Sequence, residues 1–356
     1  MKRRAFLSFL MGSTAATMLT TPVRAAAKEK SRYYQGPASD HFDGLHFSNP
    51  WDEAEPKGFL DVLRWKMNST RAVWPEEFPI PKRDQPPALN ANGEYRVSYI
   101  GHASFLVQIA GLNILCDPVW SDRASPVSFM GPKRVNPPGV ALEDLPKIDL
   151  ILISHNHYDH LDIETLKKLH AKFNPRIITP LGNDTIIKDD IRDANVTAYD
   201  WYDHVDIGDV RIHIEPTHHW SARGMGDRRE ALWASFVIQS QSKKICFIGD
   251  TGFGGGHAFK IIGERHKEID LALIPIGAYE PRWFMSRYHI NPEEAVRAKK
   301  LLRAKQAIGH HWGTFQLTDE PIMKPIEDLK IALAKYQKTE NDFKTLRPGG
   351  FEIYNV

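Results

Sequence analysis

The chain has 356 residues, of which 42% are hydrophobic and 25% charged, values that are ordinary for a soluble globular protein and sufficient for a large core. Two cysteines in this length exclude a scaffold held by disulfides. Lysine and arginine (46) nearly balance aspartate and glutamate (44), so the net charge is only +2.

The first 27 residues have the pattern of a secretory signal. Three basic residues, Lys2 to Arg4, precede a mostly apolar run from Ala5 to Leu19, and small-residue cleavage sites follow at 23–27. Arg3-Arg4 ahead of Ala5-Phe6-Leu7 resembles a twin-arginine signal. We therefore predict an exported, periplasmic protein. The alternative, an uncleaved anchor, is disfavoured because the apolar run is short for a bilayer span.

Removal of this signal changes the charge of the protein. Residues 1–27 hold four basic residues and no acid, so the remaining chain has a net charge of −2. A weakly acidic protein is a poor general binder of nucleic acid, because neutralising phosphates requires a basic face.

Residues 28–94 form a leader that is rich in proline and aromatic residues. One short segment, 58–67, is predicted to be helical. We expect the leader to pack on the main domain. The alternative is a surface that contacts lipid, and with it the protein would be membrane-associated.

Regular patterns begin at Tyr95 and continue to the end of the chain, so residues 95–356 are predicted to form one domain. Short β-branched and apolar runs predict strands at 96–100, 104–109, 112–116, 148–153, 176–179, 210–215, 233–239, 244–248, 271–276, 306–309 and 351–354. Helices are predicted from an N-cap at Asp162, from an N-cap at Asn291 with Pro292 in first position to about 304, and over 326–336. This order indicates a mixed α/β layer protein with its sheets inside.

The chemistry is concentrated where strands end. The run 148–153 leads directly into four potential metal ligands within six residues: His155, His157, Asp159 and His160. In an extended chain His155 and His157 point the same way, and the turn that follows allows Asp159 and His160 to reach a second ion.

Three further predicted strands are also followed by potential ligands. They are His218-His219 after 210–215, Asp250 after 244–248, and His310-His311 after 306–309. Each is a weak signal alone, because an aspartate after a strand is often a turn residue. Together they provide the ligands that complete two metal sites.

These motifs resemble the metallo-β-lactamase superfamily and, more closely, its branch of N-acylphosphatidylethanolamine-hydrolysing phospholipases D. The resemblance covers about residue 45 to the end. It is carried by Gly101-His102-Ala103, the stretches 117–126 and 130–134, residues 154–162, Gly249-Asp250-Thr251-Gly252, residues 275–285 and His311-Trp312-Gly313-Thr314-Phe315.

The resemblance implies a four-layered αβ/βα sandwich with a site for two divalent metal ions. His155, His157 and His219 would hold one ion; Asp159, His160 and His311 would hold the other; and Asp250 would bridge both. His219 and His311 are preferred to their neighbours His218 and His310 because the family's ligand precedes tryptophan. Zinc suits this donor set best, and iron or manganese remains open.

The implied function is hydrolysis of phospholipids of the N-acylphosphatidylethanolamine type, by a phospholipase D-like phosphodiesterase using a metal-bridged hydroxide. Asp159 would also orient the hydroxide. His289 would contact the phosphate or protonate the leaving oxygen, and Tyr158 would touch the phosphate; a purely structural role is the alternative for both. Ser128 and Phe129 would also contact the substrate, but they stand where animal members carry Gln-Tyr, which leaves the exact lipid open.

Two other functions compete with this one. The first is another metallo-hydrolase of the same fold, a lactonase or β-lactamase. The second is a non-catalytic exported metal-binding protein, which the full set of seven ligands disfavours. The expected partner is a phospholipid, with peripheral membrane contact, and the oligomeric state is open. Cys116 and Cys246 are predicted to be buried thiols, with a disulfide open if the protein is exported.

Overall fold

The computed structural model describes residues 30–51, 57–90, 93–224, 226–241 and 243–355. The predicted signal, residues 1–27, lies outside these ranges, as do 28–29, 52–56 and 91–92 of the leader. No helix within the described ranges is long and apolar enough to cross a membrane.

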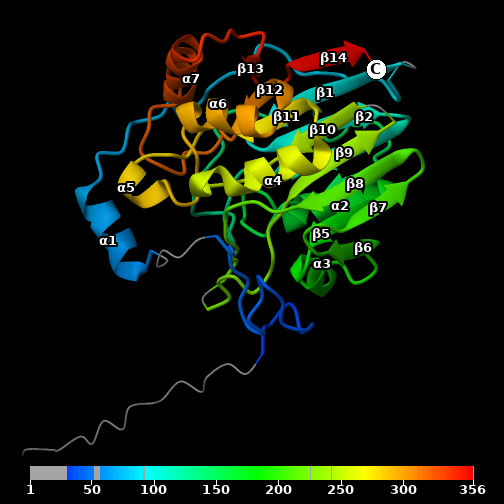
Figure 1. The fold of residues 1–356 in the computed structure, drawn as a ribbon, viewed down its shortest axis with the longest axis horizontal. Helices are drawn as coiled ribbons and strands as arrows, with labels where there is room; N and C mark the ends of the chain where they lie inside the picture. Colours follow the sequence, from blue (N-terminus) through cyan, green and yellow to red (C-terminus); the bar gives the residue numbers. More distant parts are fainter. Residues whose placement is uncertain (1–29, 52–56, 91–92, 225, 242, 356) are drawn as a thin grey trace, which may run out of the picture.

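Two seven-stranded mixed sheets form the centre of the molecule (Figure 1). The first has the strand order β14-β1-β2-β3-β4-β5-β6 and the second β13-β12-β11-β10-β9-β8-β7. The strands of the first sheet are β1 Glu94–Gly101, β2 Ser104–Ile109, β3 Leu112–Cys116, β4 Leu150–Leu152, β5 Arg176–Pro180, β6 Val196–Tyr199 and β14 Phe351–Asn355. Those of the second are β7 His204–Ile207, β8 Val210–Glu215, β9 Ser235–Ser240, β10 Lys243–Phe247, β11 Ile269–Pro275, β12 Ala304–His310 and β13 Phe343–Thr345.

The sheets pack face to face through a continuous apolar core. Alternate side chains of β1 and β2, such as Val97 and Phe105, meet Phe236 of β9 and Phe247 of β10, and all are fully buried. Because side chains alternate across a strand, the other face of each sheet needs a second cover.

Helices supply that cover on both outer faces. On the first sheet, α2 (Ile163–Phe173) and α3 (Asn183–Asp190) bury Leu166 and Ile187. On the second, α4 (His257–His266), α6 (Pro292–Leu301) and α7 (Lys324–Lys335) share a separate apolar cluster with the outer side chains of β10 and β11. The result is four layers, helix–sheet–sheet–helix, which confirms the predicted fold class.

Local sequence signals fix the starts of two of these helices. Asp162 caps α2 by accepting a hydrogen bond from the Thr165 backbone N–H at 3.2 Å. Asn291 caps α6, Pro292 occupies its first position, and Glu294 completes a reciprocal capping box. Both N-caps were predicted from the sequence. The predicted end of α6 near 304 is wrong, because the helix stops at Leu301 and β12 begins at Ala304.

Two predicted strands start two residues too early, since β4 begins at Leu150 instead of 148 and β9 at Ser235 instead of 233. Trp233 is fully buried, which explains the prediction, but it precedes β9. Its indole Nε1 donates a hydrogen bond to the Thr217 carbonyl at 2.9 Å. Cys116 and Cys246 are buried thiols without a disulfide, as predicted.

The described part of the leader lies against the domain at two places. Phe42 and Phe47 join the core between the sheets. Helix α1 (Phe59–Asn68) lies beside the short helix α5 (Arg282–Met285), where Trp65 stacks on Phe284 with ring centroids 4.9 Å apart (Figure 1). This position of α1 forms one wall of the cavity described below.

Candidate metal centre

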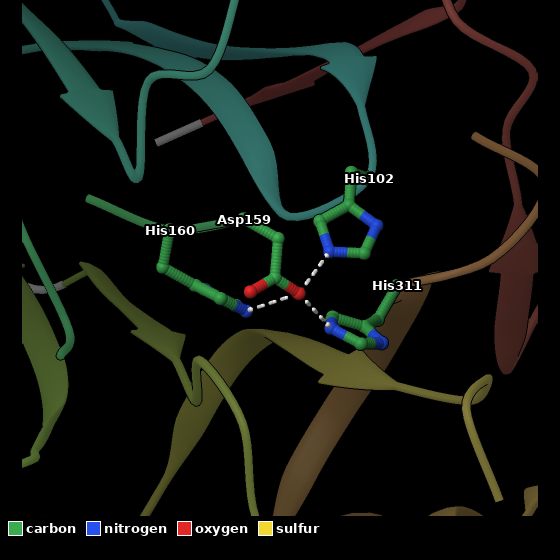
Figure 2. Close-up of side chains that lie close together, drawn as sticks. All are labelled: His102, Asp159, His160 and His311. Carbon is green, nitrogen blue, oxygen red and sulfur yellow. Dashed lines mark hydrogen bonds and ion pairs between the residues drawn. The ribbon is translucent and has the colours of Figure 1, made fainter. Parts of the chain in front are cut away.

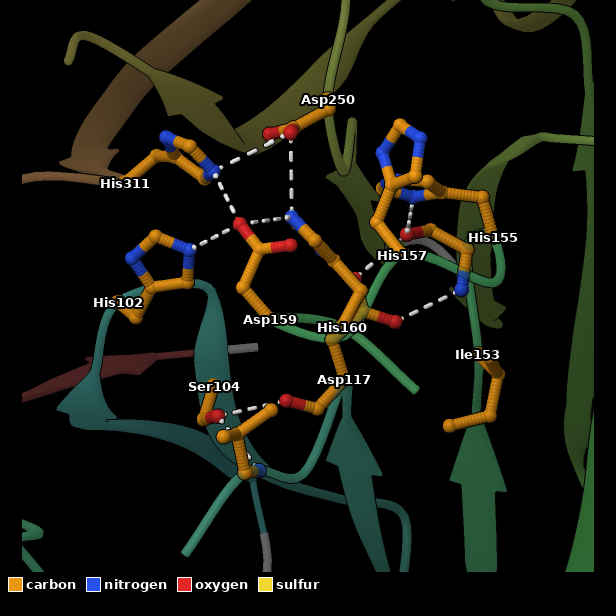
Figure 3. A network of polar contacts seen from close by, with 12 residues as sticks. His102, Ser104, Asp117, Ile153, His155, His157, Asp159, His160, Asp250 and His311 are labelled. Carbon is orange, nitrogen blue, oxygen red and sulfur yellow. Dashed lines mark hydrogen bonds and ion pairs between the residues drawn. The ribbon is translucent and has the colours of Figure 1, made fainter. Parts of the chain in front are cut away.

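The loops that follow β4, β8, β10 and β12 meet at one edge of the sandwich. Strands β8, β10 and β12 run in the same direction, since β9 is antiparallel to both β8 and β10, and β10, β11 and β12 are parallel. Their carboxyl ends therefore share an edge, the usual position of a site in such sheets. Figure 3 shows side chains from both sheets gathered at that edge.

Three histidines form a first group there. The Nε2 atom of His155 lies 2.9 Å from Nδ1 of His157, and Nε2 of His219 lies 3.4 Å from the same atom. All three nitrogens thus face one point, and the second nitrogen of His157 is buried without a hydrogen-bond partner among the described residues. Imidazole rings that converge in this way are suited to hold a metal ion.

A second group surrounds Asp159, as Figure 2 shows. The Nε2 atoms of His102, His311 and His160 lie 2.9, 3.4 and 3.6 Å from its Oδ2 atom. His160 and His311 were predicted ligands. His102 was not a predicted ligand, although Gly101-His102-Ala103 is one of the stretches that carry the family resemblance. It lies in the turn between β1 and β2, at the same sheet edge, and this position could have indicated its role.

Asp250 lies between the two groups. Its Oδ2 atom is 3.1 Å from Nε2 of His160, 3.2 Å from Nε2 of His311 and 3.8 Å from Nε2 of His219. Its Oδ1 atom is buried without a hydrogen-bond partner among the described residues. The predicted seven ligands are therefore brought together, and the position of Asp250 suits a carboxylate shared by both groups.

Asp117, which sequence reasoning did not single out, orients histidines of both groups. Its Oδ2 atom lies 2.6 Å from Nδ1 of His160 (Figure 3). The same oxygen accepts the Ser154 hydroxyl hydrogen at 2.5 Å. The Ser154 oxygen lies 2.9 Å from Nδ1 of His155. Holding one ring nitrogen directs the other toward the centre, as second partners of metal-binding histidines do. The position of Asp117 directly after β3 is the signal that could have found it.

The charges of the site favour cations. Burial opposes the ionisation of Asp250, but His160, His311 and His289 hold the pKa of that carboxyl well below its usual range. Burial likewise opposes a charge on His311, yet Asp250 and Asp159 raise its pKa to about 9. They also raise the pKa of His160 well above its usual value. In the first group, burial lowers the pKa of His157 to about 4, which leaves a neutral ligand at pH 7.

An apolar cavity of about 400 Å³ opens from this centre. His157, Asp159 and Asp250 form part of its wall, together with apolar side chains from α1, α5 and the loops around them. These are Val62, Trp65, Trp220, Phe284, Met285, Tyr288 and Leu317, and the remaining lining residues are Lys57, Ala124, Tyr158, Arg228, Ala278 and His289.

The predicted substrate residues have different positions relative to this cavity. His289 lines it, with Nδ1 3.9 Å from the Asp250 carboxylate. Tyr158 also lines it, while its hydroxyl donates to the Arg223 carbonyl at 2.7 Å. Ser128 and Phe129 are not among the lining residues. Arg123 donates a hydrogen bond to the Ser128 carbonyl, and the Phe129 side chain is 77% exposed. Their contact with substrate stays a prediction.

The neighbours of two predicted ligands lie elsewhere. His218 Nδ1 accepts a hydrogen bond from the Trp51 indole at 3.0 Å, which ties the leader to the domain. His310 packs between Phe105 and Phe247 in the core, with ring centroids 5.7 Å from each. Neither belongs to a group of potential metal ligands among the described residues.

Comparison with known proteins defines the class. Residues 112–312 match the family described as Beta-lactamase superfamily domain. The fold matches the solved structures of Igni18, a metallo hydrolase from Ignicoccus hospitalis (TM-score 0.54, 21% identity, 74% of this chain and 99% of that chain), and of isothiocyanate hydrolase from Delia radicum gut bacteria (TM-score 0.59, 18% identity, 73% and 100%). The chain belongs to the metallo-β-lactamase superfamily and is a metal-dependent hydrolase of that class.

Curated relatives define the branch. The chain is 41% identical to N-acyl-phosphatidylethanolamine-hydrolyzing phospholipase D 1 of Caenorhabditis elegans over 264 residues, 71% of this chain and 74% of the relative. It is 32% identical to an uncharacterised protein of Mycobacterium tuberculosis over 90% of this chain and 83% of that protein. The predicted resemblance to this phospholipase branch is confirmed.

Metal binding should release protons. Since the pKa of His311 is about 9 and that of His160 is also raised, both rings are protonated in the metal-free protein at pH 7 and must lose their protons to bind an ion. Apparent affinity should therefore fall as the pH decreases, by about tenfold per pH unit for each ring that must lose its proton. Zinc titration calorimetry in buffers of different ionisation enthalpy, from pH 6 to 8, measures this release. An affinity independent of pH would contradict it.

Loss of the Asp117 carboxylate should weaken metal binding in both groups. Asp117→Asn presents an amide to His160 and Ser154, so we expect a loss of affinity of about 10- to 100-fold, measured by competition with a chromophoric chelator. Asp149→Asn is the matched control, because Asp149 directly precedes β4, at the end of that strand away from the ligands, and accepts a hydrogen bond from the Asn113 backbone N–H. Equal affinities in both variants would show that Asp117 does not orient the ligands.

Proposed function

We propose that the protein is a phospholipase D-like phosphodiesterase that hydrolyses phospholipids of the N-acylphosphatidylethanolamine type. The observation that carries this proposal is the apolar cavity, because its wall combines apolar side chains with His157, Asp159 and Asp250 of the metal centre. A lipid with a phosphate at one end and acyl chains beyond it matches that combination. The phospholipase named among the relatives supports the same reaction.

We propose that the site holds two divalent ions and that they are zinc, because the predicted donor set consists of five histidines and two aspartates. Two such ions lower the pKa of a water and offset charge on phosphoryl oxygens. Asp159 and Asp250 hold the negative charge that balances the ions. Asp159 also lies at the cavity wall, where it can accept a hydrogen bond from the attacking water.

His289 is assigned to binding rather than to proton donation. Burial lowers the pKa of this ring to about 4, so it is neutral at pH 7. Divalent ions nearby would disfavour the charged form further. A neutral imidazole is a hydrogen-bond donor but a weak acid. His289 Nδ1, buried and without a hydrogen-bond partner among the described residues, is therefore proposed to contact a phosphoryl oxygen.

The surface around the cavity suits contact with a membrane. Leu60, Leu63 and Met67 of α1 are exposed large apolar side chains, and so is Trp283 of α5. Arg64 lies over the Trp283 ring, with its guanidinium carbon 5.0 Å from the centroid. Apolar and basic side chains side by side are typical of peripheral binding to lipid, and we propose that this surface presents the cavity to the membrane.

The reaction has a direct test. Purified protein should release phosphatidic acid from N-acylphosphatidylethanolamine, and hydrolysis in ¹⁸O-water should place the label in the phosphatidic acid, because water attacks phosphorus. His289→Ala should lower kcat/KM about 10- to 100-fold while leaving metal content intact. His204→Ala, an exposed histidine on β7, is the control. Efficient opening of lactones or β-lactams with every phospholipid left untouched would overturn the proposal.

Export by a twin-arginine route is part of the proposal and rests on Arg3-Arg4 and the run that follows. Replacing both arginines with lysine should retain the protein inside the cell, as judged by fractionation of a bacterial host. Unchanged recovery from the periplasm would contradict this route and leave general secretion. Replacing Lys28 and Lys30 with arginine is the control, since it leaves the signal intact.

A further inference from the structure

The cavity beside the metal centre carries two cations that the ions do not explain. Lys57 and Arg228 are among its lining residues, whereas its lining carboxylates are Asp159 and Asp250 of the metal centre. No carboxylate within the described ranges forms an ion pair with Arg228. A positive charge without an ion-pair partner, in a wall that is apolar beyond the metal centre, favours an acceptor on the ligand.

Arg228 is held in position by bonds that use only two of the five N–H groups of its guanidinium. Its guanidinium carbon lies 4.3 Å from the centroid of the Trp220 ring. One terminal nitrogen donates to the Lys57 carbonyl at 2.9 Å, and the other to the Tyr288 hydroxyl at 3.4 Å. The Nε atom is buried, and its hydrogen has no acceptor among the described residues. A buried donor without an acceptor costs free energy, so an acceptor on a ligand would be favourable.

The position of Arg228 relative to the metal centre sets the size of that ligand. Trp220 contacts both, because its ring centroid is 4.5 Å from that of the His157 ring and 4.3 Å from the Arg228 guanidinium carbon. The guanidinium therefore lies no more than about 9 Å from the His157 ring. The amide oxygen of an N-acylated ethanolamine stands roughly 7 Å from phosphorus when the chain is extended, about the length of two backbone residues.

We propose that Arg228 is a specificity-determining residue that binds the amide carbonyl oxygen of the leaving N-acylethanolamine. This inference rests on the proposed function. An unmodified ethanolamine head group would instead bring an ammonium ion toward Arg228 and Lys57, and like charges repel. N-acylation removes that positive charge and supplies the acceptor, so these two residues favour the N-acylated lipid over plain phosphatidylethanolamine.

Arg228 also has a structural contact, since its bond to the Lys57 carbonyl ties the segment before α1 to the domain. Loss of that contact would affect all substrates alike. The readout that separates the two roles is the ratio of kcat/KM for N-acylphosphatidylethanolamine to that for phosphatidylethanolamine, measured in the same mixed micelles.

Arg228→Gln should lower this ratio about 10- to 100-fold, the range for loss of one charged hydrogen bond, mainly through a lower kcat/KM for the N-acylated lipid. Arg228→Lys keeps the charge but loses the planar fork, so it should lower the ratio less. It also serves as the test if the glutamine variant does not fold. The matched control is Arg297→Gln, because Arg297 stacks on Phe253, 4.2 Å from the centroid, and does not line this cavity.

Three outcomes of these measurements would contradict the role of Arg228. A ratio unchanged in Arg228→Gln and Arg228→Lys, with both lipids slowed equally, would overturn the inference and leave Arg228 a structural residue. A greater loss for phosphatidylglycerol than for the N-acylated lipid would overturn the assignment of the acceptor to an amide. Failure of the unaltered protein to hydrolyse any of these lipids would overturn the proposed function, and this inference with it.

Discussion

Asp159 and Asp250 place two carboxylates in the interior, and the charge of these groups is the constraint on which the site depends. Burial alone would make both acids reluctant to ionise, yet surrounding imidazoles hold their pKa values well below the usual range. In return, the carboxylates raise the pKa values of His160 and His311. The site is thus built around positive charge, which protons supply in the metal-free protein and metal ions replace.

The fold makes this arrangement possible by bringing distant segments to one edge. His157, His219, Asp250 and His311 follow different strands, and the parallel course of β8, β10 and β12 brings three of the four together. The two sheets form a rigid apolar base under the site, and the leader adds the outer wall of the cavity through α1. Because that wall is apolar, the same geometry that holds metal also favours a substrate with hydrocarbon beside its reacting group.

Much of this was predictable because the signals are local. The ligand run from His155 to His160 is contiguous, and the caps at Asp162 and Asn291 are short-range patterns. Other features have no local signal: α3, α4, β6 and β7 are short or polar, and α4 follows three glycines that resemble a loop. The roles of Asp117, His102 and Arg228 depend on contacts between segments far apart in the sequence. The same holds for Phe129, whose loop is turned outward by bonds from Arg123 to the Ser128 and Gly131 carbonyls.

The central claim is that the histidines and aspartates at this edge bind two metal ions, one in each group. The most direct measurement is anomalous X-ray diffraction from crystals of the purified protein, collected on both sides of the absorption edge of the metal found by elemental analysis. The account predicts two anomalous peaks, one among His155, His157 and His219, the other beside Asp159, His160 and His311, with Asp250 between them. A fully loaded crystal with a single peak, or with its peaks away from these residues, would contradict it.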